Sequence, residues 1–352
     1  MEKNEGCVAL SKISAHDFST RLFDFWNQSH RVLPWRSDPS PFHVWVSEIM
    51  LQQTRVDTVK GYYLRFVDAL PSVKALADAP EDVYLKLWEG LGYYSRVRNL
   101  HRAALEIQNR FHGEIPSSYE ELVSPPGIGD YTANAILACA FHQKTVAVDG
   151  NLIRVYARLF ASSIDPGKPA DRKKVQKGFL QWLEGDSATF NQALMEIGQT
   201  ICIPNGKPFC SDCPFASFCL AHLKKSEDRY PNLNKRPVQK AVKKTVFVVR
   251  CKDKILLRKR PDKGLLASLY ELPNVDGELT LEEARKEWCK KGYHVESIVD
   301  LGCAKHVFSH QIWEMTGYAV SISSPLLNDL FVDEGQRKSL YPIPTAFSYF
   351  LP

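Results

Sequence analysis

Four cysteines within 18 residues constrain the fold of this chain more than any other feature. They follow the pattern C-x7-C-x2-C-x5-C and comprise Cys202, Cys210, Cys213 and Cys219. The chain has nine cysteines in all, an odd number with uneven spacing, which argues against a secreted disulfide framework and favours a reducing compartment. The cluster therefore predicts a metal site. Zinc suits four thiolates, although zinc ribbons usually have two C-x-x-C knuckles and this pattern has one.

The length and composition indicate an ordinary globular protein. A chain of 352 residues has room for two to three domains, and 44% hydrophobic with 24% charged residues excludes a disordered or fibrous chain. No apolar run approaches the roughly 18 residues that span a bilayer, and the opening segment MEKNEGCVALSKIS lacks the apolar block of a signal peptide. We therefore expect an intracellular, cytoplasmic protein with no membrane association, which in a bacterium would be associated with the nucleoid.

The hydrophobic pattern divides the chain into two domains. Over residues 1–223 the apolar positions recur at helical spacing, which predicts an all-α domain. Residues 224–240 are polar, contain two prolines and show no periodicity, as expected of an interdomain linker. The runs TVFVVR and KILLRKR then predict a β-hairpin, and LTLEEARKEWCKKG predicts a helix. Residues 241–352 are therefore expected to form a smaller α+β domain.

The positive charge is concentrated in one stretch. The net charge is +5, yet the segment from Lys224 to Lys263 contains 15 Lys or Arg against four Asp or Glu. Such a stretch is a candidate footprint for nucleic acid. The alternative is a solvated linker with no partner.

A glycine-containing turn precedes a predicted helix in the run SPPGIGDYTANAIL. Gly127 and Gly129 would expose backbone N–H groups at the helix N-terminus, an arrangement that suits a phosphate. Asp149, 20 residues further on, makes the segment resemble a dinucleotide-binding fingerprint. That alternative is disfavoured because two prolines precede the turn, the third glycine is Thr132, and no series of βαβ units surrounds it. We therefore expect a helix-hairpin-helix that grips a DNA backbone.

Two carboxylates are candidates for acid and electrostatic catalysis. Glu48 lies on the same helical face as Ile49 and Gln52 and has no cationic partner three or four residues later, so its burial would raise the pKa toward that of a general acid. The alternative is a glutamate that faces water at the helix edge. Asp149 ends an apolar run before Gly150 and could simply cap the next helix, or could stabilise a positively charged transition state.

Taken together, these motifs resemble the helix-hairpin-helix DNA glycosylases, and most closely the adenine DNA glycosylase family. The hairpin, the VDGN run at residues 148–151, the WVSEIMLQQT run at residues 45–54 and the four cysteines occur in the family's order, and the resemblance covers nearly the whole chain. It implies a [4Fe-4S] cluster in the loop 202–219, although the first gap has seven residues where the family commonly has six. It also implies a C-terminal Nudix-like domain.

The resemblance assigns roles to four residues around the reaction centre. Glu48 falls on the acid that protonates adenine N7, and Asp149 on the carboxylate that stabilises the sugar cation. Asn151 would position that aspartate or the attacking water. Tyr131 stands where related bifunctional enzymes have a lysine, and because a phenol cannot form a Schiff base we expect base removal without efficient strand cleavage, with Tyr131 hydrogen-bonding near Asp149.

The resemblance also assigns residues that recognise the two bases. The adenine pocket would be formed by Arg31, Leu33, Trp35, Val56 and Gln192. Gln53 and Tyr93 would wedge into the base stack. The KHVFSHQIWEM run would probe 8-oxoguanine through His306, Phe308, Ser309 and His310. Pyrophosphatase activity is not expected, because Cys289 and Lys290 stand where the Nudix metal glutamates belong.

The resulting prediction is a multidomain protein with an all-α helix-hairpin-helix glycosylase domain and an α+β Nudix-like domain. It would act as a monomer on double-stranded DNA and excise adenine opposite 8-oxoguanine or guanine by hydrolysis. The rival functions are an oxidised-pyrimidine glycosylase with lyase activity, disfavoured by Tyr131 and the C-terminal domain, and a catalytically silent DNA-damage binding protein, disfavoured by the presence of both carboxylates. A third rival, a Nudix hydrolase, lacks its metal ligands.

Overall fold

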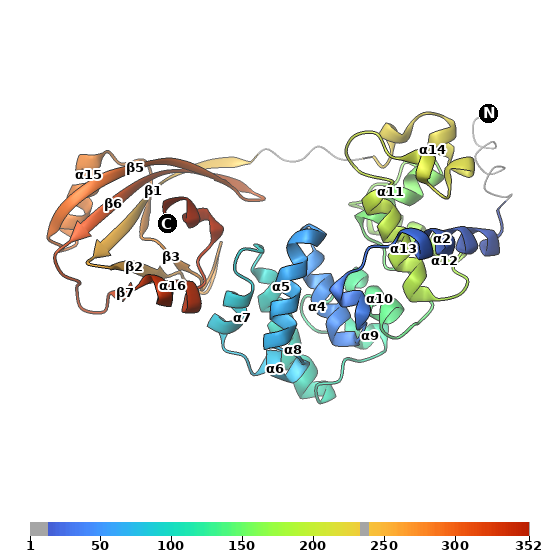
Figure 1. The fold of residues 1–352 in the computed structure, drawn as a ribbon, viewed down its shortest axis with the longest axis horizontal. Coiled ribbons are helices and arrows are strands. Elements are labelled where there is room, and N and C mark those ends of the chain that lie inside the picture. Colours follow the sequence, from blue (N-terminus) through green and yellow to red (C-terminus); the bar gives the residue numbers. More distant parts are fainter. Residues whose placement is uncertain (1–12, 233–238, 352) are drawn as a thin grey trace. The chain divides into compact units, whose positions relative to one another are not determined.

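The computed structural model describes residues 13–232 and 239–351, and these form two compact units (Figure 1). The helical unit comprises residues 1–78 with 98–235, and the C-terminal unit comprises residues 79–97 with 236–352. The opening segment and the part of the predicted linker at 233–238 lie outside the described residues. The sequence placed residues 79–97 in the helical domain, whereas their contacts group them with the C-terminal unit.

The helical unit is built from helices and 3-10 turns, with no strand among its described residues. Its helices are α2 (Ala15–Ser29), α3 (Pro34–Ser37), α4 (Pro41–Leu51), α5 (Val56–Ala69), α6 (Val73–Ala77), α9 (Tyr119–Leu122), α10 (Asp130–Cys139), α11 (Gly150–Leu159), α12 (Pro169–Leu180), α13 (Ser187–Thr200) and α14 (Leu220–Leu223). Helix α8 (Ser95–Phe111) crosses the boundary between the units. The 3-10 turns are η1 (Cys210–Asp212), η2 (Ala216–Phe218) and η3 (Glu227–Arg229). The described residues include no helix with the length and apolarity needed to cross a bilayer.

The core of the helical unit joins segments far apart in the sequence. Phe18 of α2 is fully buried and stacks on Trp182 and Phe215, with ring centroids 4.4 Å and 4.3 Å apart. The apolar residues of α10, α11 and α13 complete this core. Because α11 and α13 are held inside this core, the residues at their ends are placed on a rigid frame.

The C-terminal unit contains a mixed sheet in the order β3-β2-β1-β6-β5, as well as two short strands, β4 and β7, that pair with β1 and β2. The strands are β1 (Lys240–Cys251), β2 (Lys254–Lys259), β3 (Tyr270–Glu271), β4 (Asn274–Asp276), β5 (Val295–Val307), β6 (Gln311–Ile322) and β7 (Leu330–Val332). The helices are α7 (Glu81–Leu87), α15 (Leu281–Lys290) and α16 (Glu334–Leu340), with the 3-10 segment η4 (Thr345–Phe350). The predicted hairpin is present as β1 and β2, and the predicted helix as α15.

Alternation along β1 fills two cores, one on each face of the sheet. Val246 and Val248 belong to the core that includes η4, whereas Phe247 and Val249 belong to the core that includes α15. This period of two is the one expected of a strand buried on both faces. The sheet is therefore covered on both sides, as the α+β prediction requires.

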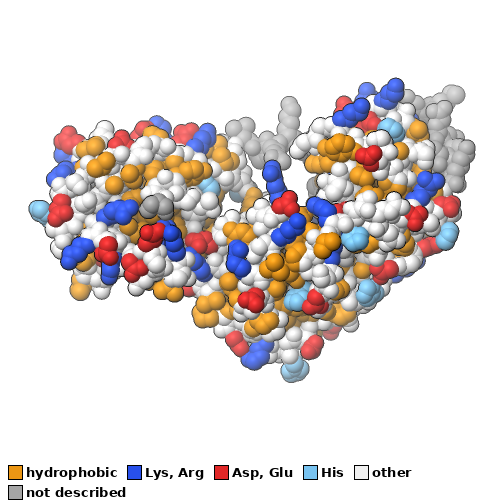
Figure 2. All heavy atoms as spheres, in the orientation of Figure 1, with side chains coloured by type: hydrophobic (Ala, Val, Ile, Leu, Met, Phe, Trp, Pro, Cys, Tyr) orange, Lys and Arg blue, Asp and Glu red, His pale blue; other side chains and the backbone are white. Residues whose placement is uncertain are grey.

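Some cations of the basic stretch at the start of this unit form ion pairs. Lys243 and Lys244 contact Glu278 and Asp276 at 2.8 Å and 2.6 Å, and Lys259 contacts Asp82 at 3.2 Å. On the face shown in Figure 2, basic and acidic side chains are interspersed over the C-terminal unit. For these cations the pairing favours the alternative of an ordinary solvated surface over a dedicated nucleic-acid footprint.

Residues 79–97 are held to the rest of the C-terminal unit by partly buried polar contacts. The ammonium group of Lys86 donates to Glu89 at 2.6 Å and to the backbone oxygen of Tyr341 at 3.1 Å. The other carboxylate oxygen of Glu89 accepts from the backbone N–H of Ile343 at 2.6 Å. These contacts, between residues 254 and 255 positions apart, explain why the segment groups with the C-terminal part of the chain.

Candidate active site

Glu48 and Tyr131 are joined by a hydrogen bond in the helical unit. Glu48 lies in α4 and is partly buried, and the hydroxyl of Tyr131, in the first turn of α10, donates to its Oε2 at 2.5 Å. Burial raises the pKa of Glu48 to about 7, and the negative charge of Asp149 adds to the rise, while the bonds from Tyr131 and the charge of Arg36 oppose it. The role of Glu48 as an acid stays a prediction, for which the structure provides a partly buried carboxyl group with a raised pKa.

Asp149 is held by the start of α11. Its Oδ1 accepts from the backbone N–H of Leu152 at 2.8 Å, and its Oδ2 accepts from the amide of Asn151 at 2.6 Å. Burial raises the pKa of Asp149, and both hydrogen bonds lower it. Asp149 therefore caps α11, as the helix-cap alternative stated. This does not exclude a catalytic role, because the Asp149 carboxylate is also close enough to Glu48 to raise the pKa of Glu48. The bond that we expected Tyr131 to make near Asp149 is made to Glu48.

A buried arginine connects Asn151 to the cysteine loop. Arg154 donates to Asn151 Oδ1 at 2.7 Å, to the backbone oxygen of Gly198 at 2.6 Å and to that of Cys202 at 2.6 Å. A Cβ at Gly198 would lie 2.5 Å from the Cβ of Asn151, so only glycine allows α13 to approach this closely. Arg154 is a positioning residue that the sequence reasoning missed, since an arginine in an amphipathic helix gives no distinct signal.

The predicted adenine pocket is partly assembled. An open pocket of about 310 Å³ is lined by Arg31, Leu33 and Gln192, together with Arg36 and Cys139. The Oε1 atom of Gln192 is buried and has no hydrogen-bond partner. A buried orphan acceptor is costly unless a ligand donates to it.

Two of the five residues predicted for the adenine pocket do not line it. Trp35 is 7% exposed and packs edge-on against Tyr63, and Val56 begins α5. Glu48 does not line the pocket either. However, burial raises the pKa of the pocket residue Cys139 to about 12, and the negative charge of Glu48 adds to this rise. The pocket and the acid are therefore neighbours.

Glu196 is a buried carboxylate that the sequence reasoning missed. It is fully buried in α13, and its two oxygens accept from Arg31 Nε at 2.5 Å and from Arg36 Nη2 at 2.8 Å. Burial would raise the pKa of Glu196, but the two guanidinium groups lower it below its ordinary value. The signal was present in the sequence, because Glu196 stands between Met195 and Ile197 in the same way that Glu48 stands among apolar residues.

Both predicted wedge residues have backbone conformations that residues other than glycine rarely adopt. The φ angles of Gln53 and Tyr93 are 57° and 47°, in the left-handed region. Both side chains are exposed. Strained, exposed positions of this kind cluster at functional sites. Gln53 belongs to the helical unit and Tyr93 to the C-terminal unit.

The predicted 8-oxoguanine loop is the turn between β5 and β6. Phe308 packs against Trp313 with centroids 4.8 Å apart, whereas Ser309 and His310 are exposed. The hydroxyl of Ser309 donates to that of Tyr93 at 2.9 Å, which joins two of the predicted recognition residues. Burial lowers the pKa of His306.

The hairpin glycines precede α10 as expected. Gly127 has a φ of 87°, and a Cβ there would lie 2.6 Å from the Cβ of Asn99. Gly129 is the N-cap of α10 and is exposed, with open space around its Cα. The backbone N–H groups of this turn are thus accessible to a phosphate.

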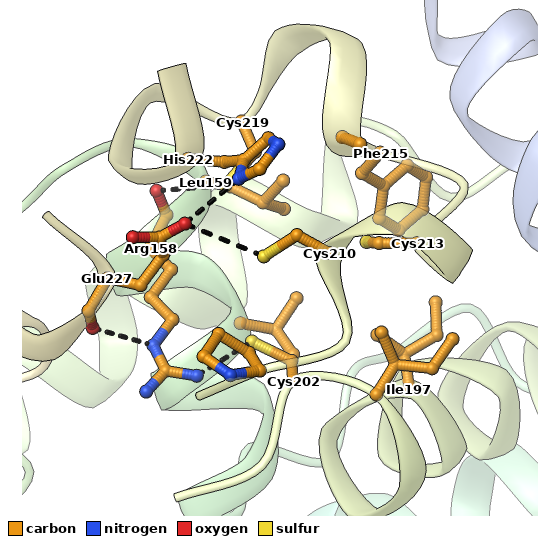
Figure 3. Close-up of a pocket in the computed structure, with 14 residues that line it drawn as sticks. Arg158, Leu159, Ile197, Cys202, Cys210, Cys213, Phe215, Cys219, His222 and Glu227 are labelled. Atoms are coloured by element: carbon orange, nitrogen blue, oxygen red, sulfur yellow. Dashed lines mark hydrogen bonds and ion pairs between the residues drawn. The ribbon is translucent and has the colours of Figure 1, made fainter. Parts of the chain in front are cut away.

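The four cysteines line one cavity next to α11 (Figure 3). The guanidinium of Arg158 donates to Cys202 Sγ at 3.3 Å, and the thiol of Cys219 donates to the backbone oxygen of Arg158 at 3.4 Å. No three of these sulfur atoms lie within 4.8 Å of one another in the described chain; Cys210 instead lies that close to His222 and Glu227. Four thiolates around a single zinc ion would be about 3.8 Å apart, given Zn–S bonds of about 2.3 Å.

The degenerate Nudix helix is α15. Arg285 donates to the backbone oxygen of Val295 at 2.9 Å, and Cys289 and Lys290 are exposed. A thiol and an ammonium group do not form the oxygen-rich site that magnesium prefers.

Known proteins similar to this chain share both halves. A family model described as HhH-GPD superfamily base excision DNA repair protein matches residues 46–184, and a NUDIX domain model matches residues 245–351. The adenine DNA glycosylase of Buchnera aphidicola subsp. Baizongia pistaciae is 34% identical over 302 residues, which cover 83% of this chain and 82% of the relative. That of Rattus norvegicus is 33% identical, with 83% and 68% covered.

The chain belongs to the adenine DNA glycosylase family. It is a DNA glycosylase, a hydrolase that acts on N-glycosyl bonds, and the fold class predicted from the motifs is confirmed. Among solved structures, the helical part resembles a thermostable thymine-DNA glycosylase, with 27% identity, a TM-score of 0.55 and coverage of 60% of this chain and 97% of that chain. A non-covalent endonuclease III–DNA complex has 20% identity, a TM-score of 0.50 and coverage of 60% and 98%, which shows the shared fold.

Replacing Glu48 with Gln should change how the stability of this glycosylase depends on pH. A carboxylate whose pKa rises to about 7 on folding stabilises the native state at acid pH, and this contribution is lost as pH increases toward 7. Between pH 5 and pH 8 the free energy of unfolding of the Glu48→Gln variant should therefore rise by about 2 kcal/mol relative to wild type. Urea unfolding at both pH values measures the difference. Parallel changes in the two proteins would contradict the raised pKa.

Replacing Glu196 with Gln should destabilise the glycosylase at neutral pH. The change leaves the guanidinium groups of Arg31 and Arg36 beside a neutral amide, and breaking a buried ion pair typically costs at least 3 kcal/mol. Because Arg31 is 34% exposed, we expect a loss of about 3 kcal/mol in urea unfolding. The control is Gln199→Ala, which removes another partner of Arg31 without leaving the charges unpaired. Equal losses in both variants would refute the role of Glu196.

Proposed function

We propose that this chain is a monofunctional adenine DNA glycosylase that removes adenine opposite 8-oxoguanine or guanine. The observation that supports this most strongly is the pair of carboxylates Glu48 and Asp149, one with its pKa raised to about 7 and the other fixed at a helix N-terminus. Two carboxylates with different environments are the arrangement that acid-assisted cleavage of a glycosidic bond requires.

The reaction follows from these two groups. Once adenine is flipped out of the duplex, the Glu48 carboxylic acid transfers its proton to N7, and the bond between C1′ and N9 breaks, its electron pair leaving with the neutral base. Asp149 stabilises the positive charge that develops on the sugar. Asn151 holds the Asp149 carboxylate in place. Water adds its oxygen to C1′, and its proton regenerates a carboxylic acid.

The hydroxyl of Tyr131 keeps Glu48 oriented. It donates to Glu48 Oε2, which leaves the other oxygen free to face the base. Burial raises the pKa of Tyr131 well above its ordinary value, so the phenol stays protonated and is no nucleophile. This supports hydrolysis without a Schiff-base intermediate, and hence without lyase activity.

The pocket beside Glu48 suits adenine. The orphan acceptor of Gln192 matches the exocyclic amine of adenine, and Arg31 and Leu33 supply polar and apolar walls. Trp35 and Val56 would border the base from α3 and α5. Adenine is a normal base, so an enzyme that removes it only from mispairs must also recognise the base on the opposite strand. We assign this recognition to Phe308, Ser309 and His310, with His306 nearby.

Double-stranded DNA is the proposed partner. The exposed turn at Gly127 and Gly129 supports binding of the phosphate backbone, and Gln53 and Tyr93 support insertion into the base stack. Relatives named as adenine DNA glycosylases and a similar fold solved with DNA agree with this proposal. The monomeric state stays a prediction.

The four cysteines are proposed to hold a [4Fe-4S] cluster. Their sulfur atoms line one cavity but are spread more widely than a single zinc ion allows. When bound, the cluster would cross-link the end of α13 to the loop before α14. Arg158 would stabilise the Cys202 thiolate and brace the loop through the backbone oxygen of Ile203.

The proposed reaction is tested with labelled duplexes that contain A opposite 8-oxoguanine, G or T, incubated with excess protein. We expect strand breaks at A opposite 8-oxoguanine and G only after hot alkali, and none at A opposite T. The rate should fall as pH rises through about 7, because Glu48 loses its proton. Glu48→Gln should lower the rate at least a hundredfold, whereas Asp24→Asn, at an exposed carboxylate, should not change it.

Two outcomes would overturn parts of this proposal. Strand breaks without alkali would reveal a lyase and refute the argument from Tyr131. Tight binding of the mispair without base release would identify a silent damage-binding protein.

Metal analysis of the purified protein tests the cluster. We expect four iron and four sulfide per chain and little zinc, with the loss of bound iron in a Cys213→Ser variant and its retention in a Cys303→Ser variant, whose exposed cysteine lies in β5. One zinc per chain without sulfide would contradict the proposal.

A further inference from the structure

An open groove of about 410 Å³ runs along α12, and none of its lining residues belongs to the catalytic pair, the adenine pocket or the cysteine cluster. Its lining comes from one helical face, formed by Ala170, Lys173, Lys174, Lys177 and Gly178, with Gln181 at the C-terminal end. Tyr156 of α11 also lines it. Positions three, four, seven, eight and eleven residues after the first share one side of a helix, so these side chains converge on the groove.

The groove is strongly cationic. Lys173, Lys174 and Lys177 are exposed, and none of them forms an ion pair with a described residue. Asp171 is the one carboxylate of α12, and its Oδ2 accepts from the backbone N–H of Asp165 at 2.9 Å. Three ammonium groups on one face of a helix, without an acidic partner among the described residues, favour the binding of an anion.

The hydroxyl of Tyr156 adds a fixed donor. The side chain is 7% exposed, its hydroxyl forms no hydrogen bond with a described residue, and it faces the groove. The ring is held by Phe160 and Phe179, with centroids 4.3 Å and 5.4 Å away. The hydroxyl is therefore available to donate a hydrogen bond to a group that enters the groove.

A glycine makes this arrangement possible. A Cβ at Gly178 would lie 2.4 Å from Cε2 of Tyr156 and 2.8 Å from its hydroxyl oxygen. Any other residue would push the ring out of place and fill the floor of the groove. The groove therefore depends on the glycine in α12 and is not only the space between long lysine side chains.

We propose that this groove binds a phosphate group, with the Tyr156 hydroxyl and the Gln181 amide donating to its oxygens and the three lysines supplying the charge. A phosphate has several acceptor oxygens and suits this combination of point charges and neutral donors. The phosphate group comes either from the DNA backbone or from a free phosphate compound. The site is additional to the hairpin turn at Gly127 and Gly129 and does not depend on the proposed adenine chemistry.

Calorimetric titration of the full-length protein with sodium phosphate tests the site, at constant ionic strength and with sodium chloride as the reference. Wild type should bind one phosphate saturably. Tyr156→Phe keeps the ring and removes the hydroxyl, and it should weaken binding about tenfold, as expected for a hydrogen bond to a charged group. Combined replacement of Lys173, Lys174 and Lys177 by Gln should abolish binding. Lys168→Gln is the control, because this exposed cation precedes α12 and does not line the groove.

Equal phosphate affinity in wild type and Tyr156→Phe, or an equal loss in Lys168→Gln, would overturn the proposal. If Tyr156→Phe does not fold, Lys174→Gln alone should still weaken binding severalfold, and unchanged affinity in that variant would likewise overturn it. The source of the phosphate is decided by duplex DNA binding at several salt concentrations. A DNA phosphate predicts that the slope of log K against log salt falls by about 1 in the triple-lysine variant, whereas an unchanged slope assigns the groove to a free phosphate compound.

Discussion

The hydrogen bond from the backbone N–H of Leu152 to Asp149 is the interaction on which the rest of the site depends. It caps α11 and at the same time fixes the carboxylate that we propose to be catalytic, so helix formation also places this charge. The same helix then presents Arg154, which donates to the backbone of the cysteine loop, and Arg158, which contacts Cys202 Sγ. One helix of ten residues thus connects the reaction centre to the proposed cluster.

The second constraint is electrostatic. Glu48 and Asp149 lie close enough for each ionised form to disfavour the other, and burial strengthens this effect. Asp149 accepts two hydrogen bonds that favour its charged form, whereas Glu48 accepts one from Tyr131. Burial raises the pKa of Glu48 to about 7, and the additional donor at Asp149 favours the charged form of that carboxylate. The nearby Glu196 does not compete for a proton, because Arg31 and Arg36 lower its pKa.

The sequence predicted most of the fold and the central pair of residues, and the reasons are physical. Helical periodicity identified α10 and α11, the runs TVFVVR and KILLRKR identified β1 and β2, and an unpaired carboxylate on an apolar face made Glu48 a candidate acid. What it missed involves groups brought together by tertiary packing. Glu196 finds its cations 160 and 165 residues earlier in the chain, and Tyr131 donates to Glu48 across 83 residues. No local pattern encodes such partners.

The grouping of residues 79–97 shows a further limit of local patterns. The segment is helical, so periodicity assigns it to the helical domain, yet Lys86 and Glu89 are satisfied by backbone groups near the C-terminus. Within the described residues, the chain therefore passes from one unit to the other at residues 78–79 and 97–98. Tyr93 lies in residues 79–97 and contacts Ser309, so one of the two predicted wedge residues belongs to the same compact unit as the loop predicted to contact the opposite base.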